Sequence, residues 1–172
     1  METVIRPVVN TEDEIFAGHK LWFVPVHGCD AISATANAPG FTPLIAIARH
    51  FGWDYDLMRK AADDCNHKRR VAVLKQVTPT LLLVPATKGR GDDAHDLALD
   101  LLSAVHATES KSLHITHFGF LQGRFPKTDV AAVLEFFFRY GSRLPLERLV
   151  IDIDVRSEQS LYDLMRPPAS SG

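Results

Sequence analysis

The sequence predicts a three-layer α/β/α fold with a mixed, mostly parallel central sheet. Short apolar runs alternate with amphipathic segments in the order β-α-α-β-β-α-β-α-β-α, a pattern typical of strands joined by helices that cover both faces of a sheet. The run 81–84 is apolar on both sides, which predicts a strand buried under helices on either face. The 172 residues, 46% hydrophobic and 23% charged, fit a single domain over 1–172, with 167–172 as a loose tail.

The first elements are predicted to be strands. Residues 4–9 predict an edge strand, and residues 21–26 predict a buried strand that ends at His27-Gly28-Cys29-Asp30. The segment that follows is rich in Ala, Thr, Pro and Gly. We therefore expect a loop from this point to Phe41.

Two helices are predicted next. Thr42 can cap the first helix with Pro43 at its first position, and Gly52 ends it. Asp54 caps the second helix, in which apolar residues recur at helical spacing as far as Cys65. Cys65 is therefore expected to be a core residue rather than a reactive thiol.

The remaining elements continue the alternation of strands and helices. Each helix carries an apolar stripe, and each strand is a short apolar run. They are strands at 71–74 and 81–84, a helix over 94–105, a strand from Leu113, a helix over 128–140, a strand at 149–155 and a helix from Ser157.

Composition argues against several classes of protein. A net charge of −2, with no basic run longer than 67–70, gives no reason to expect a nucleic-acid partner. Two cysteines indicate no disulfide framework, so we expect a reduced, cytoplasmic setting. The longest apolar run, 81–86, is far shorter than the roughly 20 residues of a membrane span. The oligomeric state stays open.

The segment 113–127 is the first candidate site. An apolar strand leads into a loop with two glycines and two cations, and a helix follows. Such a corner presents backbone N–H groups and the positive end of a helix dipole to an anion. Gly119 and Gly123 let the backbone approach a diphosphate, Arg124 supplies a planar donor fork, and Phe120 or Phe125 can stack on a ribose or base. The alternative is a tight connection with an exposed arginine and a core phenylalanine.

Other polar clusters are weaker candidates. His27 and Asp30 follow the predicted strand end, where a general base would be exposed to a ligand. The loop 87–91 lacks the Gly-Lys-Ser/Thr order of a nucleoside triphosphatase. The acids at 92–96 suit a helix start, and Asp152 and Asp154 suit a surface or capping role. We expect neither a metal site nor a cofactor.

The order of the elements and the loop spacing over residues 20–165 resemble the macro domain, an α/β fold that binds ADP-ribose. Segment 112–138 is similar to that family's strand, phosphate loop and helix, and 146–154 is similar to its closing strand. Segment 46–65 resembles its first helical region. The family's first strand ends in an Ala-Asn-rich motif followed by glycines, for which Asn37 and Gly40 are the candidates here.

The resemblance implies a macro-like fold and a nucleotide-like partner of the ADP-ribose class, with possible ADP-ribosyl hydrolase activity. Two alternatives stay open: an interaction module that keeps the fold without ligand binding, and a hydrolase of another substrate. Catalysis would fall to Asn37, Asp30 or His27. The ligand-binding candidates are Gly28, Asp30, Asn37, Gly40, Gly119, Phe120, Gly123, Arg124 and Phe125.

Overall fold

The fold was analysed in a computed structural model of the whole chain. It describes residues 1–8, 29–36, 42–85, 94–115 and 135–154. The description below refers to these ranges.

A mixed six-stranded sheet forms the centre of the molecule, in the order β1-β6-β5-β2-β4-β3. Five neighbouring strands are parallel, and only the edge strand β3 runs antiparallel, against β4. The predicted fold class is therefore confirmed. The strands are β1 (Glu2–Val8), β2 (Ala31–Ala36), β3 (Ala72–Leu74), β4 (Thr80–Pro85), β5 (Ser112–Ile115) and β6 (Arg148–Asp154).

Three labelled helices connect the strands: α2 (Thr42–Phe51), α3 (Tyr55–Lys68) and α4 (Ala94–Ala107). The predicted boundaries of α2 and α3 follow from local chemistry. Gly52 takes a φ of 70° directly after α2, a left-handed conformation that glycine adopts without steric cost. Asp54 caps α3, its carboxylate accepting a hydrogen bond of 3.0 Å from the backbone N–H of Asp56. Residues 135–141 are also helical, the end of the predicted helix at 128–140.

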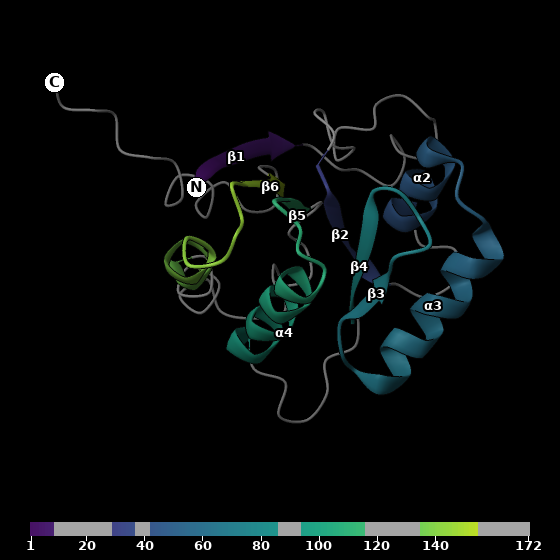
Figure 1. Cartoon of the computed structure of the whole chain (residues 1–172). Helices are drawn as coiled ribbons and strands as arrows, with labels where there is room; N and C mark the ends of the chain where they lie inside the picture. Colours follow the sequence, from purple (N-terminus) through teal and green to yellow (C-terminus); the bar gives the residue numbers. More distant parts are fainter. Residues whose placement is uncertain (9–28, 37–41, 86–93, 116–134, 155–172) are drawn as a thin grey trace, which may run out of the picture.

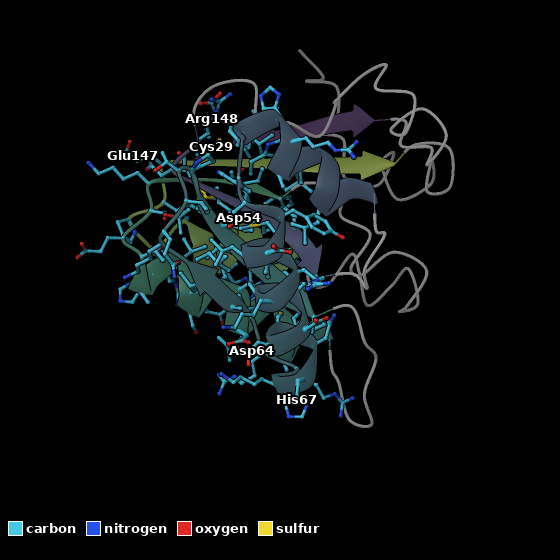
Figure 2. All side chains as sticks on the ribbon, turned by 90° about the vertical axis from the view of Figure 1, so that its right-hand side faces the viewer. Cys29, Asp54, Asp64, His67, Glu147 and Arg148 are labelled. Atoms are coloured by element: carbon cyan, nitrogen blue, oxygen red, sulfur yellow. The ribbon has the colours of Figure 1, made fainter. Side chains whose placement is uncertain are left out.

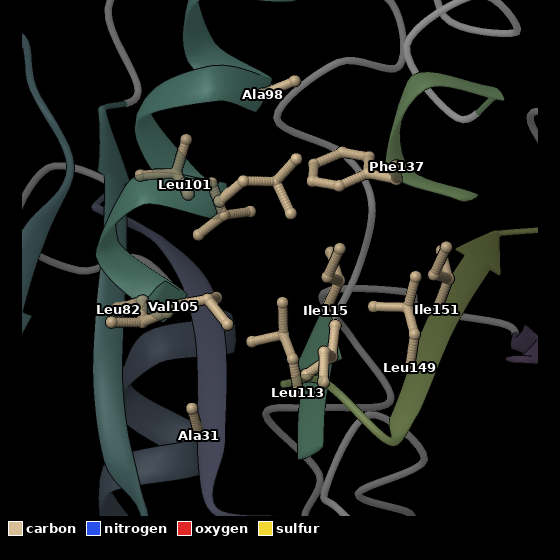
Figure 3. Close-up of a cluster of buried hydrophobic side chains, with 13 residues drawn as sticks. Ala31, Leu82, Ala98, Leu101, Val105, Leu113, Ile115, Phe137, Leu149 and Ile151 are labelled. Carbon is tan, nitrogen blue, oxygen red and sulfur yellow. The ribbon is translucent and has the colours of Figure 1, made fainter. Parts of the chain in front are cut away.

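The helices cover the two faces of the sheet (Figure 1). On one face α2 and α3 pack over β2 and β4, and Cys65 lies in this core as predicted. On the other face α4 and the helical segment 135–141 form the second core, in which Phe137 points towards the α4 side chains above the strands (Figure 3). Strand β4 contributes to both cores, as its two-sided apolar pattern predicts: Leu81 and Leu83 face one, Leu82 and Val84 the other.

The structure corrects one element of the prediction. Residues 31–36, expected to be loop, form β2, which pairs with β4 on one side and β5 on the other. Small residues of low β-propensity dominate this strand, and burial between two strands and two helix layers outweighs that propensity. The strand predicted at 21–26, the start of the helix at 128–140 and the helix from Ser157 lie outside the described residues.

Candidate functional site

The carboxyl ends of the five parallel strands share one edge of the sheet. In open α/β sheets, ligands bind outside this edge. The described part of the chain reaches the last residue of each strand, and the residues that come next in the sequence lie outside it. These last residues are Val8, Ala36, Pro85, Ile115 and Asp154.

A topological switch point lies at this edge beside β2. After β2 the chain continues to α2 on one face of the sheet. After β5, the neighbour of β2, the next described helical segment, 135–141, packs on the opposite face. Where neighbouring parallel strands send their connections to opposite faces, a crevice opens between the two connections. The end of β2 next to β5 is therefore the place in this fold where a ligand site is expected.

The register of the two strands aligns their predicted site segments. Ser33 of β2 pairs with Ile115 of β5. Asn37 and Gly119 each follow this pair by four residues in the sequence. The two segments predicted to hold a ligand thus start from equivalent levels of two adjacent strands.

A side chain of α3 holds the end of β2. The Asn66 side-chain amide donates a short hydrogen bond to the backbone carbonyl of Ala36, the last residue of the strand. Asn66 lies in the last turn of α3, so the bond ties the carboxyl end of the helix to the carboxyl edge of the sheet. The residue that follows Ala36 in the sequence is Asn37.

The carboxyl end of α3 is basic. Arg69 takes a left-handed φ of 58° and closes the helix, its N–H donating to the carbonyl of Cys65. Arg70 forms an ion pair with Asp100 of α4, with 3.2 Å between Nη2 and Oδ1. Lys68 pairs with Asp64 one turn earlier. Cations at this end of a helix also interact favourably with the helix dipole.

Cys65 is unsuited to chemistry at this edge. Its Sγ lies 3.1 Å from the backbone carbonyl oxygen of Arg70 and 3.4 Å from that of Leu83, two acceptors for its single S–H proton. Burial raises the pKa of the thiol to about 12. A thiol with this pKa holds its proton at neutral pH, so Cys65 is a poor nucleophile.

Solved structures show the same architecture. The macro domain of ganglioside induced differentiation associated protein 2 (GDAP2) superposes with a TM-score of 0.58 at 11% identity, over 98% of this chain and 86% of that one. The chain has the macro-domain fold. A Trypanosoma brucei macrodomain in complex with ADP superposes with a TM-score of 0.58 at 15% identity, over 94% of this chain and 68% of that one. The macrodomain of Mycobacterium tuberculosis DarG superposes with a TM-score of 0.53 at 12% identity, over 87% of this chain and 97% of that one. No protein-family model and no curated protein matches the sequence.

Asp30 lies at the amino edge of the sheet in this macro-domain fold, whereas the ligand site is expected at the carboxyl edge. It directly precedes β2, so it lies at the amino end of that strand. Its backbone N–H donates to Oγ of Ser112 at 2.8 Å, and its carboxylate accepts from the backbone N–H of Lys111 at 2.9 Å. In Figure 2, the arrowheads of β1 and β6 point away from Cys29, the neighbour of Asp30. Asp30 therefore joins the start of β2 to the start of β5. The strand predicted at 21–26 lies outside the described residues, so its end before Asp30 stays a prediction.

The other predicted site residues lie outside the described part of the chain. Within that part, no group of three or more His, Cys, Asp or Glu side chains is placed to hold a metal ion. No described helix is long and apolar enough to cross a membrane. The site residues not described are His27, Gly28, Asn37, Gly40, Gly119, Phe120, Gly123, Arg124 and Phe125.

Sequence reasoning missed Asn66. One signal was present, because asparagine is a poor helix former and here lies within the helix, one residue after the core position Cys65. A polar side chain kept in such a place often bonds to a backbone group. Its partner was hidden because the residues of β2 were assigned to a loop.

Proposed function

We propose that this protein binds ADP-ribose, or a related nucleotide diphosphate, in the crevice at the carboxyl ends of β2 and β5. The observation that carries the proposal is the switch point between these neighbouring strands, whose connections leave towards opposite faces of the sheet. The shared fold adds support, because one macrodomain with this architecture was solved in complex with ADP.

The residues that follow the two strands have the chemistry that such a ligand needs. After β5, Gly119 and Gly123 let backbone N–H groups approach a diphosphate, and Arg124 offers two parallel donors. Phe120 or Phe125 stacks on the ribose or the base. After β2, Asn37 supplies an amide for ribose hydroxyls, and Gly40 gives the backbone room.

The end of β2 strengthens the argument for Asn37. The resemblance to macro domains placed an Ala-Asn motif at the end of the first strand of that family. Here β2 ends at Ala36, directly before Asn37. The case for Gly28 and His27 rests on the strand predicted at 21–26, which lies outside the described residues.

Hydrolysis of an ADP-ribosyl bond is the finer part of the proposal. Asn37 is the candidate for orienting the ribose, and His27 is the candidate for a general base. Asp30 is left out of this role because its carboxylate is engaged at the amino edge.

The decisive experiment is a calorimetric titration of the purified protein with ADP-ribose. Wild type is compared with Arg124→Ala, Gly123→Glu and Asn37→Ala, with Asp30→Asn as the matched control from the opposite edge. We expect saturable binding that the first three variants lose or weaken by about tenfold or more. Asp30→Asn keeps the wild-type affinity.

Two results would contradict the proposal. Absence of heat at millimolar ADP-ribose, with the protein folded, favours an interaction module without a nucleotide ligand. Binding that survives all three loop variants places the ligand elsewhere. Where binding is established, release of ADP-ribose from a modified protein substrate is assayed with Asn37→Ala and His27→Ala.

A further inference from the structure

A groove lies on the outer surface of α4. It has a volume of about 570 Å³ and runs between α4 and the helical segment 135–141 with the turn that follows. Its floor is apolar: Leu102 is buried, and Phe136 and Leu144 are half-buried. Among the described residues, its lining is completed by Asp96, Leu99, Ser103, His106, Tyr140 and Arg143.

Two hydrophobic side chains of the groove are unusually exposed. Leu99 is 55% exposed, the highest value for a large hydrophobic side chain in the described ranges, and Tyr140 is 39% exposed. Tyr140 packs against Phe136 with ring centroids 4.5 Å apart, and the Arg143 guanidinium lies 5.2 Å from its ring centroid. An open apolar groove rimmed by charges is typical of a protein-interaction surface.

The α4 side of the groove has a self-complementary pattern. Asp96, Leu99, Ser103 and His106 recur at spacings of three, four and three residues, so they form one stripe along the helix. Asp96 and His106 lie five residues on either side of Leu101, and Leu99 and Ser103 lie two residues on either side. A two-fold axis through that level, with the helices antiparallel, sets Asp96 opposite His106 and Leu99 opposite Ser103 of the second copy.

We propose that this face is the interface of a homodimer, in which α4 packs antiparallel against α4 of a second copy. Each pairing that the symmetry creates is complementary. The large Leu99 meets the small Ser103 and enters the apolar groove beside it. The Asp96 carboxylate meets the imidazole of His106, which can donate a hydrogen bond, and the Arg143 guanidinium beside it.

The occupant follows from this pattern. In an isologous dimer the two-fold axis repeats every contact, so each complementary pair of residues occurs twice. A second copy of the chain is therefore the occupant that this pattern favours. One helix and one groove make a small interface, so the dimer is weak and forms at high protein concentration. Leu99 is its central anchor, since buried central side chains carry most of the binding energy of an interface.

Sedimentation velocity from micromolar to near-millimolar protein concentrations tests the proposal without nucleotide. We expect the wild-type mass to rise from one chain to two. Leu99→Arg should weaken dimerisation by about tenfold or more. Tyr55→Arg is the matched control, because Tyr55 is 45% exposed on α3 on the other face of the sheet. It should leave dimerisation unchanged, and circular dichroism checks that both variants fold.

A charge exchange tests the antiparallel pairing itself. Asp96→Lys places a cation against His106 and Arg143 of the second copy, and His106→Glu places an acid against Asp96. Each substitution should weaken the dimer, and the double variant should restore it. A strictly monomeric wild type would overturn the proposal and leave the groove to another partner. A dimer indifferent to Leu99→Arg, or a double variant that restores nothing, would also overturn it.

Discussion

The Asn66 side chain holds the backbone carbonyl of Ala36 at the point where β2 reaches the carboxyl edge of the sheet. This bond connects helix packing to the proposed ligand site, because Asn37 is the next residue along the chain. Losing it frees a partly buried carbonyl, at a cost of about 1 kcal/mol of unfolding free energy.

We expect Asn66→Ala to speed amide hydrogen exchange in the peptide that begins at Asn37, with little change in β4. The same variant should weaken ADP-ribose binding. Asp63→Ala, on the exposed side of the same helix, is the control and should change neither. Equal exchange in wild type and Asn66→Ala would show that the bond does not position the end of β2, whether or not the protein binds ADP-ribose.

Asp30 joins the amino ends of two strands, so its substitution should affect stability and not binding. Its carboxylate accepts from the backbone N–H of Lys111, and its backbone carbonyl accepts from the N–H of Thr80 at 3.0 Å. Asp30→Ala removes the first bond and should lower the free energy of unfolding by about 1 kcal/mol in urea denaturation. Asp30→Asn retains an acceptor oxygen and should lose less. A loss of ADP-ribose affinity in both variants would return Asp30 to the ligand site.

The sequence predicted the fold well where local chemistry determines it. The cap at Asp54 and the glycine after α2 mark helix ends through bonds and dihedral angles within a few residues. Strand β4 was recognisable because both of its faces are apolar. Each of these signals is contained in a short window of sequence.

The candidate site was harder to predict because its context is tertiary. The composition of β2 is typical of a loop, and only its pairing with β4 and β5 makes it a strand. With residues 31–36 taken as loop, the sequence did not reveal that Asp30 directly precedes a strand or that Asn37 directly follows one. The bond from Asn66 to Ala36 joins residues 30 positions apart, so no local pattern reveals the partner of Asn66.

The Cys65 thiol should make the unfolding free energy fall at alkaline pH. Burial raises its pKa from 9.0 to about 12. Between these values the unfolded chain releases the proton while the folded protein retains it, so the stabilisation present below pH 9.0 is lost as pH rises towards 12.

We expect urea denaturation between pH 9 and 11 to show a steeper loss for wild type than for Cys65→Ser. Serine keeps a donor for the carbonyls of Arg70 and Leu83 but does not titrate in this range. The comparison removes the contributions of lysines and tyrosines, which both proteins share. Parallel stability curves would show that the thiol is not protected in the folded state.

Asp100 makes two bonds to the chain just before β3, and we expect only one of them to matter for stability. Its Oδ2 accepts from the backbone N–H of Val71 at 2.8 Å, and its Oδ1 pairs with Arg70. The Arg70 side chain is 76% exposed, so this ion pair contributes little. The N–H of Val71 is partly buried and loses its acceptor when the carboxylate is removed.

Asp100→Ala should therefore lower the free energy of unfolding by about 1–2 kcal/mol, while Arg70→Ala changes it by less than about 0.5 kcal/mol. Urea denaturation at low and high salt measures both. The effect of Asp100→Ala should persist at high salt, because a hydrogen bond to a backbone group is screened much less than an exposed ion pair. Equal losses in the two variants, both abolished by salt, would assign the stabilisation to the ion pair instead.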